Sequence, residues 1–153
     1  LLNVAENAGA DGLHAIASRS RGTPRIANRL LRRARDYAQI RGDGSVSADA
    51  VSRALDLEGV DALGLDDLDR TYLRTIGTVY NGDRASGEPV EPGLEAVAAT
   101  MNEDAGTLED VVEPYLLQIA FLARTRRGRM LTQRGADHVG GGARAKTEDN
   151  LFR

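Results

Sequence analysis

The residues of this sequence that could do chemistry are its arginines, which fall into two groups. Seven arginines and no acidic residue occur between residues 12 and 35, and five arginines and no acidic residue occur between residues 114 and 136. The span between residues 43 and 69 is the reverse, with eight carboxylates and one arginine. The net charge of −3 therefore conceals two local basic regions, at which anionic partners are expected.

Arg25 is the main candidate in the first region. Thr23 is a favourable N-cap, and Pro24 suits the first helical position because its missing N–H would be unpaired there anyway. Arg25 then lies in the first turn, at the positive end of the helix dipole, where a cation is unfavourable unless an anion shares the site. The apolar residues of this helix recur on the side opposite the arginines, at positions 26, 27, 30, 31, 34, 37 and 38.

The other arginines of this helix, Arg29, Arg32 and Arg33, have a more ordinary interpretation. A basic helix face can contact a neighbouring subunit, pair with the acidic span or face water. We therefore predict surface or interface roles for these three, and a contact with a bound anion for Arg25.

The first part of the chain is predicted to be a small helical unit. A short helix around residues 13–17 is followed by a break at 20–22 and by the helix that begins at 24. After a turn at 41–44, Ser47 can cap a further helix. The apolar pattern lapses near residue 60, so we place the first domain at residues 1–62.

The second part is predicted to contain three helices and a hairpin. The helices are expected at 66–80, at 94–101 and from Thr107, where Thr107 and Asp110 would form a capping box; a loop is expected at 81–93. The carboxylates that begin the first of these helices favour its dipole; they are Asp66, Asp67 and Asp69. Pro114 should kink the third helix or remove one of its hydrogen bonds.

Residues 121–125 and 129–132 are expected to form two short strands around a turn at Arg127-Gly128. Three helices followed by a hairpin are typical of a winged helix, in which the hairpin, or wing, contacts nucleic acid. We place this domain at residues 63–140. The polar, Gly-rich tail at 141–153 is predicted to be disordered.

The wing carries the second group of arginines. We predict that Arg124 and Arg129 contact DNA, with Arg126 and Arg127 as secondary contacts. Phosphate contacts of this kind position a protein on a duplex without reading its sequence. The alternative role of such charges is to prevent edge-to-edge aggregation of strands, and it is compatible with DNA binding.

The composition excludes several classes of site. There is no cysteine, so a disulfide or a thiolate metal site is impossible. His14 and His138 have no second ligand at a suitable spacing, so no metal site is predicted. No apolar run approaches the roughly 20 residues that span a bilayer, and no signal peptide is recognisable. These features predict a cytoplasmic protein without a membrane segment.

Several stretches resemble the RuvB family of AAA+ ATPases, in the same order along the chain. The longest is RSRGTPRIANRLLRR at residues 19–33, followed by LGLDDLDR at 63–70, EPYLLQ at 113–118 and FLARTRRGR at 121–129. The similarity covers roughly residues 10–140. It implies a mainly α-helical chain, with a small AAA+ lid helical bundle followed by a winged-helix domain with a short β-hairpin wing.

The resemblance also implies a function. Members of the family form hexameric rings on the duplex arms of Holliday junctions and, with the junction-binding partner RuvA, use ATP with magnesium to drive branch migration. The family's sensor 2 arginine, which contacts the phosphates of the nucleotide, corresponds to Arg25. The wing arginines that contact DNA correspond to Arg124 and Arg129. Arg126 stands where the family usually has proline at the wing tip.

The motifs of ATP hydrolysis are not in this sequence. It has no Gly-x-x-x-x-Gly-Lys-Ser/Thr phosphate loop, no acidic Walker B strand and no arginine finger supplied to a neighbour. Together with the abrupt start at Leu1, this predicts a C-terminal fragment with no catalytic residue of its own and no ATPase activity. One alternative is a winged-helix transcription regulator with a helical effector or dimerisation domain. Another is a protein-interaction module, which would leave the wing arginines without a purpose.

Overall fold

The computed structural model describes residues 8–80 and 90–144 of the chain. The chain divides into two compact units, Leu1–Asp67 and Leu68–Arg153. The described residues are mostly helical, with one two-stranded antiparallel sheet. The predicted fold class is therefore confirmed.

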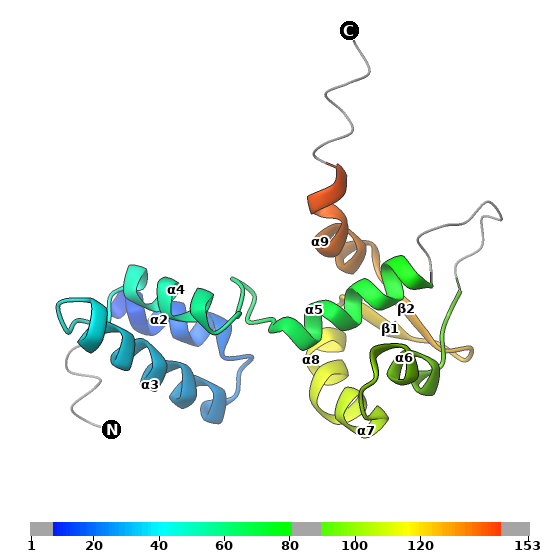
Figure 1. The fold of residues 1–153 in the computed structure, drawn as a ribbon, viewed down its shortest axis with the longest axis horizontal. Coiled ribbons are helices and arrows are strands. Elements are labelled where there is room, and N and C mark those ends of the chain that lie inside the picture. The colour runs from blue at the N-terminus through cyan, green and yellow to red at the C-terminus, as the bar shows by residue number, and fades with distance from the viewer. Residues whose placement is uncertain (1–7, 81–89, 145–153) are drawn as a thin grey trace, which may run out of the picture. The chain divides into compact units, whose positions relative to one another are not determined.

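The first unit consists of three helices around one apolar core. The helices are α2 (Ala10–Arg19), α3 (Pro24–Arg41) and α4 (Ala48–Leu57), and Figure 1 shows them lying alongside one another. Each contributes buried side chains, among them Ile16 from α2, Leu30 from α3 and Leu55 from α4. The helix expected at 13–17 is thus longer than predicted, and α3 continues three residues beyond the last apolar position of its stripe.

The helix starts follow the sequence signals with one difference. The Ser47 hydroxyl accepts a hydrogen bond from the Ala50 amide at 3.2 Å, as an N-cap does. Thr23 occupies the N-cap of α3, and Pro24 takes the first helical position. However, the Thr23 hydroxyl donates to the Arg21 carbonyl at 3.4 Å and does not cap a helix amide.

The second unit begins within the first turn of α5 (Asp67–Arg74), which continues as the π-helical turn η1 (Thr75–Val79). Helix α6 (Leu94–Met101) follows. A composite third helix follows, formed by α7 (Ala105–Thr107), the π-helical turn η2 (Leu108–Val112) and α8 (Glu113–Gln118). Strands β1 (Leu122–Arg124) and β2 (Arg129–Leu131) form the hairpin, and α9 (Gln133–Arg144) ends the unit (Figure 1). The core includes Leu73, Ile76, Val97, Leu108 and Leu116.

The composite third helix begins earlier than predicted. Its cap is Asp104, whose carboxylate accepts a hydrogen bond from the Thr107 amide at 2.7 Å. The prediction of a capping box at Thr107 and Asp110 is therefore wrong: a capping carboxylate three residues upstream places Thr107 inside the helix. Within the helix, the hydrogen-bond register changes at η2, where the Glu113 amide donates to the Leu108 carbonyl. This change falls just before Pro114, where the sequence predicted a disruption.

Helix α9 runs to Arg144 and so enters the predicted tail at residues 141–144. That the tail is disordered stays a prediction. The helix is started by Thr132, whose carbonyl accepts from the Ala136 amide and whose hydroxyl accepts from the Gly135 amide. Residues 145–153 of the predicted tail and 81–89 of the predicted loop lie outside the described residues.

None of the helices in the described ranges combines the length and the apolar composition needed to cross a membrane.

Candidate nucleotide and DNA interfaces

The turn before α3 is held by a segment distant in the sequence. Arg21 adopts a left-handed backbone conformation, with φ of 54°, and its Nε donates to the Gly64 carbonyl at 2.8 Å. Its guanidinium also lies 3.8 Å from the carboxylate of Asp66. A Cβ on Gly64 would come within 2.5 Å of the Arg19 carbonyl oxygen, so the two segments are in close contact. This contact fixes the position from which α3, and with it Arg25, begins.

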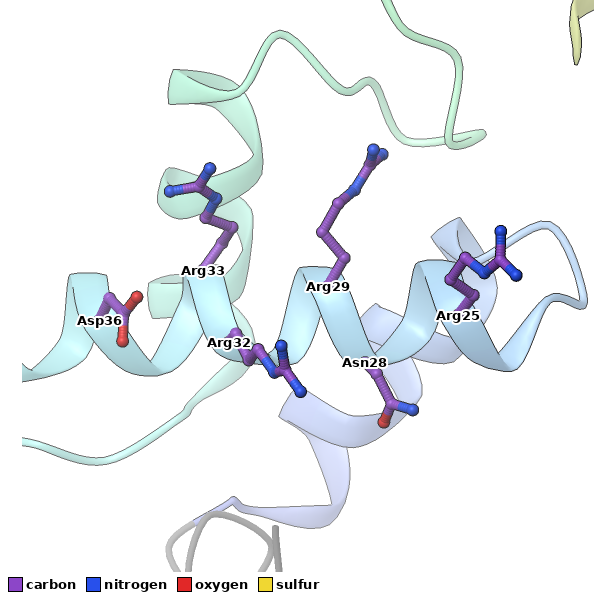
Figure 2. A pocket seen from close by; sticks show the side chains of 6 residues that line it. All are labelled: Arg25, Asn28, Arg29, Arg32, Arg33 and Asp36. Atoms are coloured by element: carbon purple, nitrogen blue, oxygen red, sulfur yellow. The ribbon is translucent and has the colours of Figure 1, made fainter.

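The outer face of α3 carries an open cavity of about 480 Å³. All of its lining residues belong to this helix; they are Arg25, Asn28, Arg29, Arg32, Arg33 and Asp36. Figure 2 shows Arg25 and Arg29 one turn apart, with their guanidinium groups extending away from the helix axis. The helix therefore buries one face in the core and presents a basic face on the other side.

The charges of this cavity are only partly compensated. Arg33 pairs with Glu58 at 3.4 Å, and Asp36 is held by the neighbouring Arg35 at 2.6 Å. Within the described part of the chain, Arg25, Arg29 and Arg32 form no ion pair or side-chain hydrogen bond. Three guanidinium groups on one helix face without a counter-charge repel one another, and a bound anion would relieve that repulsion. That Arg25 contacts a nucleotide stays a prediction.

The wing has the predicted hairpin geometry. Arg124 pairs with Arg129 across the two strands, and the Thr125 amide donates to the Gly128 carbonyl at 2.8 Å. The Thr125 hydroxyl accepts hydrogen bonds from the amides of Arg127 and Gly128, at 3.2 and 3.0 Å. The turn at Arg127-Gly128 is therefore a closed, hydrogen-bonded loop.

The two arginines at the base of the wing bind a carboxylate that the sequence interpretation missed. Glu113, at the start of α8, has a fully buried side chain (0% exposed). Its Oε2 lies 2.5 Å from a terminal guanidinium nitrogen of Arg124 and accepts from the Nε of Arg124 at 2.7 Å. Its Oε1 accepts from the Nε of Arg129 at 2.8 Å. The side chain of Arg124 remains 42% exposed, whereas that of Arg129 is only 15% exposed.

A fourth residue completes this cluster. The hydroxyl of Tyr72, a buried residue of α5, donates to Oε1 of Glu113. Burial alone would raise the pKa of Glu113, but the hydrogen bonds from Arg129, Tyr72 and Arg124 outweigh it, so its pKa lies below the ordinary value. Burial raises the pKa of the Tyr72 hydroxyl, and its hydrogen bond to Glu113 raises it further. Glu113 is therefore ionised and Tyr72 neutral at physiological pH.

The two arginines at the tip of the wing are placed differently. The side chain of Arg127 is 77% exposed and lies 3.1 Å from the carboxylate of Glu91. Arg126 is exposed and has no ion-pair partner among residues 8–80 and 90–144. The segment at residues 91–92 holds the wing in place: the Arg129 amide donates to the Pro92 carbonyl at 2.9 Å, and the Thr125 hydroxyl donates to Glu91.

Sequence reasoning missed Glu113 because the basic stretch that it considered began at residue 114. A signal was present: Glu109 and Glu113 are one helical turn apart and directly precede a hairpin rich in arginine. Glu109 lies 3.6 Å from Arg124 in the structure. Among the described residues, no group of three histidines or carboxylates is placed to hold a metal ion.

Comparison with known proteins connects both units to one family. The RuvB AAA lid domain matches residues 2–61, and the RuvB C-terminal winged helix domain matches residues 62–140, more than half of the chain. The chain belongs to the RuvB family. These matches therefore favour a RuvB-type protein over the alternative of a winged-helix transcription regulator.

Individual RuvB proteins resemble the chain over most of its length. It is 52% identical over 129 residues to the Holliday junction branch migration complex subunit RuvB of Dehalococcoides mccartyi (strain CBDB1), a match that covers 84% of this chain and 35% of that protein. The solved structure of the Thermotoga maritima RuvB Holliday junction branch migration motor matches with a TM-score of 0.77 at 41% identity. A mutant of the same motor matches with a TM-score of 0.78, and each of the two matches covers 86% of this chain and 42% of the solved chain.

The chain thus spans about a third of the length of the curated relative. The RuvB regions that it contains are the AAA lid and the C-terminal winged helix. The roles of individual arginines, the ligands and the partners belong to the proposal below.

Proposed function

We propose that this chain is the nucleotide-sensing and DNA-contacting part of an ATP-driven motor that moves Holliday junctions. The observation that carries the proposal is the match of both units, in order, to the two C-terminal domains of RuvB. In this proposal residues 1–62 form the lid, residues 63–140 form the winged helix, and ATP hydrolysis belongs to a further domain with a phosphate loop. The motor is a cytoplasmic hexamer that works on duplex arms with a RuvA-type partner.

The cavity on α3 fits the phosphates of a nucleotide. Arg25 lies in the first turn, where the helix dipole favours an anion, and the described residues offer it no carboxylate. In the assembled motor, Arg25 would contact the phosphates of ATP and so couple the bound nucleotide to the position of the lid. The described residues offer no cluster of metal ligands, so we assign magnesium to the phosphates and the hydrolytic domain.

The wing supplies the DNA contact in this proposal. The four wing arginines lie on one hairpin, and they are Arg124, Arg126, Arg127 and Arg129. Phosphate contacts made by this hairpin would not depend on the bases, so binding should show little sequence preference and should weaken steeply as the salt concentration rises.

The test of nucleotide sensing uses Arg25→Ala in the chain joined to a RuvB ATPase domain. We expect DNA-stimulated ATP turnover to fall at least tenfold, about 1.4 kcal/mol, because a guanidinium next to phosphate charge in a site with little water is worth that much or more. The melting temperature should stay within about one degree, since Arg25 is exposed and its side chain forms no ion pair or hydrogen bond with a described residue.

Arg41→Ala is the matched control, because Arg41 is an exposed arginine of the same helix that does not line the cavity. It should leave turnover and melting unchanged. Normal turnover in Arg25→Ala, combined with a melting temperature several degrees lower, would make Arg25 a structural residue and contradict the sensor assignment.

A further inference from the structure

The buried carboxylate of Glu113 divides the four wing arginines into two pairs. At the base, Arg124 and Arg129 bind Glu113. At the tip, Arg126 and Arg127 lie on the exposed turn. The helices before the wing, at residues 94–118, carry acidic residues and no lysine or arginine, whereas the wing is basic. These features restrict how the unit can approach DNA.

We propose that the winged-helix unit contacts the DNA backbone with the tip of its wing, through Arg126 and Arg127, while the composite helix at 105–118 stays out of the groove. In this arrangement Arg124 and Arg129 are positioning residues that hold the wing through Glu113. The inference rests on the proposed DNA contact and deepens it by assigning the surface that carries it.

The first argument is the charge of the helix pair that a helix-turn-helix protein would place on DNA. Between residues 94 and 118 the sequence has six acidic residues and no lysine or arginine. The outer face of the composite helix is formed by exposed residues that include Glu109, Asp110, Val111 and Pro114. A recognition helix in the major groove lies between two phosphate backbones. An acidic helix face is repelled by these phosphates and brings no cation to offset the repulsion.

The second argument is the state of the two arginines at the base. Arg129 is mostly buried, and its pKa is raised by the hydrogen bond to Glu113. Arg124 gives two nitrogens to the same carboxylate and has Glu109 as a further neighbour at 3.6 Å. For either arginine to bind a phosphate fully, it would have to leave Glu113, whose buried charge would then lack a partner. The positive charge of this pair is already half balanced by Glu113.

The third argument is the availability of the tip. Arg126 is exposed and has no ion-pair partner in the described ranges. Arg127 pairs with Glu91, and its own side chain is 77% exposed whereas that of Glu91 is 11% exposed. When Arg127 turns to a phosphate, Glu91 keeps the hydrogen bond from the Thr125 hydroxyl, so its carboxylate is not left without a partner. The turn that carries both arginines is closed by Thr125 and backed by the Pro92 carbonyl, and it therefore holds them at a defined place.

The experiment measures binding of the 153-residue chain to a short, fluorescently labelled duplex of mixed sequence over a series of salt concentrations. Arg126→Ala with Arg127→Ala should reduce the log-log salt slope by about 2, since each lost phosphate contact lowers the slope by about 1. The single variants Arg124→Ala and Arg129→Ala should each lower the melting temperature of the winged-helix unit. The salt slope of each folded variant should stay within about half a unit of the slope of the unaltered chain. Arg41→Ala with Arg53→Ala removes two exposed arginines of the other unit and controls for net charge.

A variant on the composite helix tests the approach independently of wing folding. Asp110→Arg places a cation on an exposed helix position. It should not change the slope if the helix stays off the DNA, whereas a helix in the groove would gain about one unit. A slope lost in folded Arg129→Ala and retained in the tip variant, or a slope raised by Asp110→Arg, would overturn this inference while the proposed DNA contact stands. No duplex binding by the unaltered chain would overturn both.

Discussion

Arg124 lies directly opposite Arg129 in the wing hairpin, and the guanidinium groups of both bind the same carboxylate, that of Glu113. Two like charges at opposed positions of an antiparallel pair repel each other. The buried carboxylate supplies the opposite charge, and the Tyr72 hydroxyl adds a fourth partner. The base of the wing is thereby joined to α5 and α8 through one ionised side chain.

Replacing Glu113 by glutamine should destabilise the winged-helix unit. The amide keeps the shape but leaves the two facing arginines with only the half-exposed Glu109 as a counter-charge. We expect a loss of roughly 2–4 kcal/mol in the free energy of unfolding, toward the lower part of the range for a broken buried ion pair because Arg124 is partly exposed. Chemical denaturation followed by circular dichroism measures the loss. The control is Glu109→Gln, which removes a half-exposed partner of the same arginines and should cost less than about 1 kcal/mol.

The stability of the unit should depend on pH through Glu113. The pKa of Glu113 in the folded protein lies below the ordinary 4.5, so folding stabilises the ionised form of this side chain. The resulting stabilisation is fully present above about pH 4.5 and is lost as the pH falls through the lower, folded-state pKa. Denaturation of the unaltered chain and of Glu113→Gln at several pH values checks the sign. The difference between them should shrink on acidification, and a difference that grows would contradict the assignment.

Removing the Tyr72 hydroxyl should have a smaller effect. Tyr72→Phe keeps the buried ring but takes one donor from Glu113, and we expect a loss of about 1–2 kcal/mol because the acceptor is charged and buried. Tyr80→Phe is the matched control, since the Tyr80 hydroxyl bonds to the Ala96 carbonyl in an exposed position. Equal losses in the two variants would mean that the Glu113 cluster adds nothing beyond an ordinary hydrogen bond.

The turn before α3 can be tested at Gly64. Gly64→Ala should destabilise the first unit for two reasons: the position has φ of 79°, and the new Cβ would come within 2.5 Å of the Arg19 carbonyl oxygen. Gly22→Ala isolates the first reason, because Gly22 also has a positive φ, of 66°, but has open space around its Cα. We expect a loss of about 1 kcal/mol at Gly22 and clearly more at Gly64, measured by thermal unfolding.

Several local features of the fold were predictable from the sequence. Pro24 at the first helical position and the apolar stripe after it predicted the start and the buried face of α3. The Arg127-Gly128 turn predicted the hairpin, and Ser47 predicted the start of α4. These features depend on contacts between residues only a few positions apart, so local spacing is sufficient to indicate them.

Local signals were insufficient where two of them competed. Thr107 and Asp110 match the pattern of a capping box. In the structure, however, Asp104 is the N-cap, because its carboxylate accepts the hydrogen bond from the Thr107 amide.

By itself, the sequence determined the family resemblance, the order of the helices and the presence of arginines on a hairpin. Only the tertiary structure decided which of those arginines are already bound. Tyr72, Glu113 and Arg129 are separated by 41 and 16 positions, and no local pattern connects them. Their contact arises because α5, α8 and the wing pack around one buried point, where an ionised carboxylate is tolerated only if several donors converge on it. The wing arginines that looked equivalent in the sequence therefore differ in the folded chain.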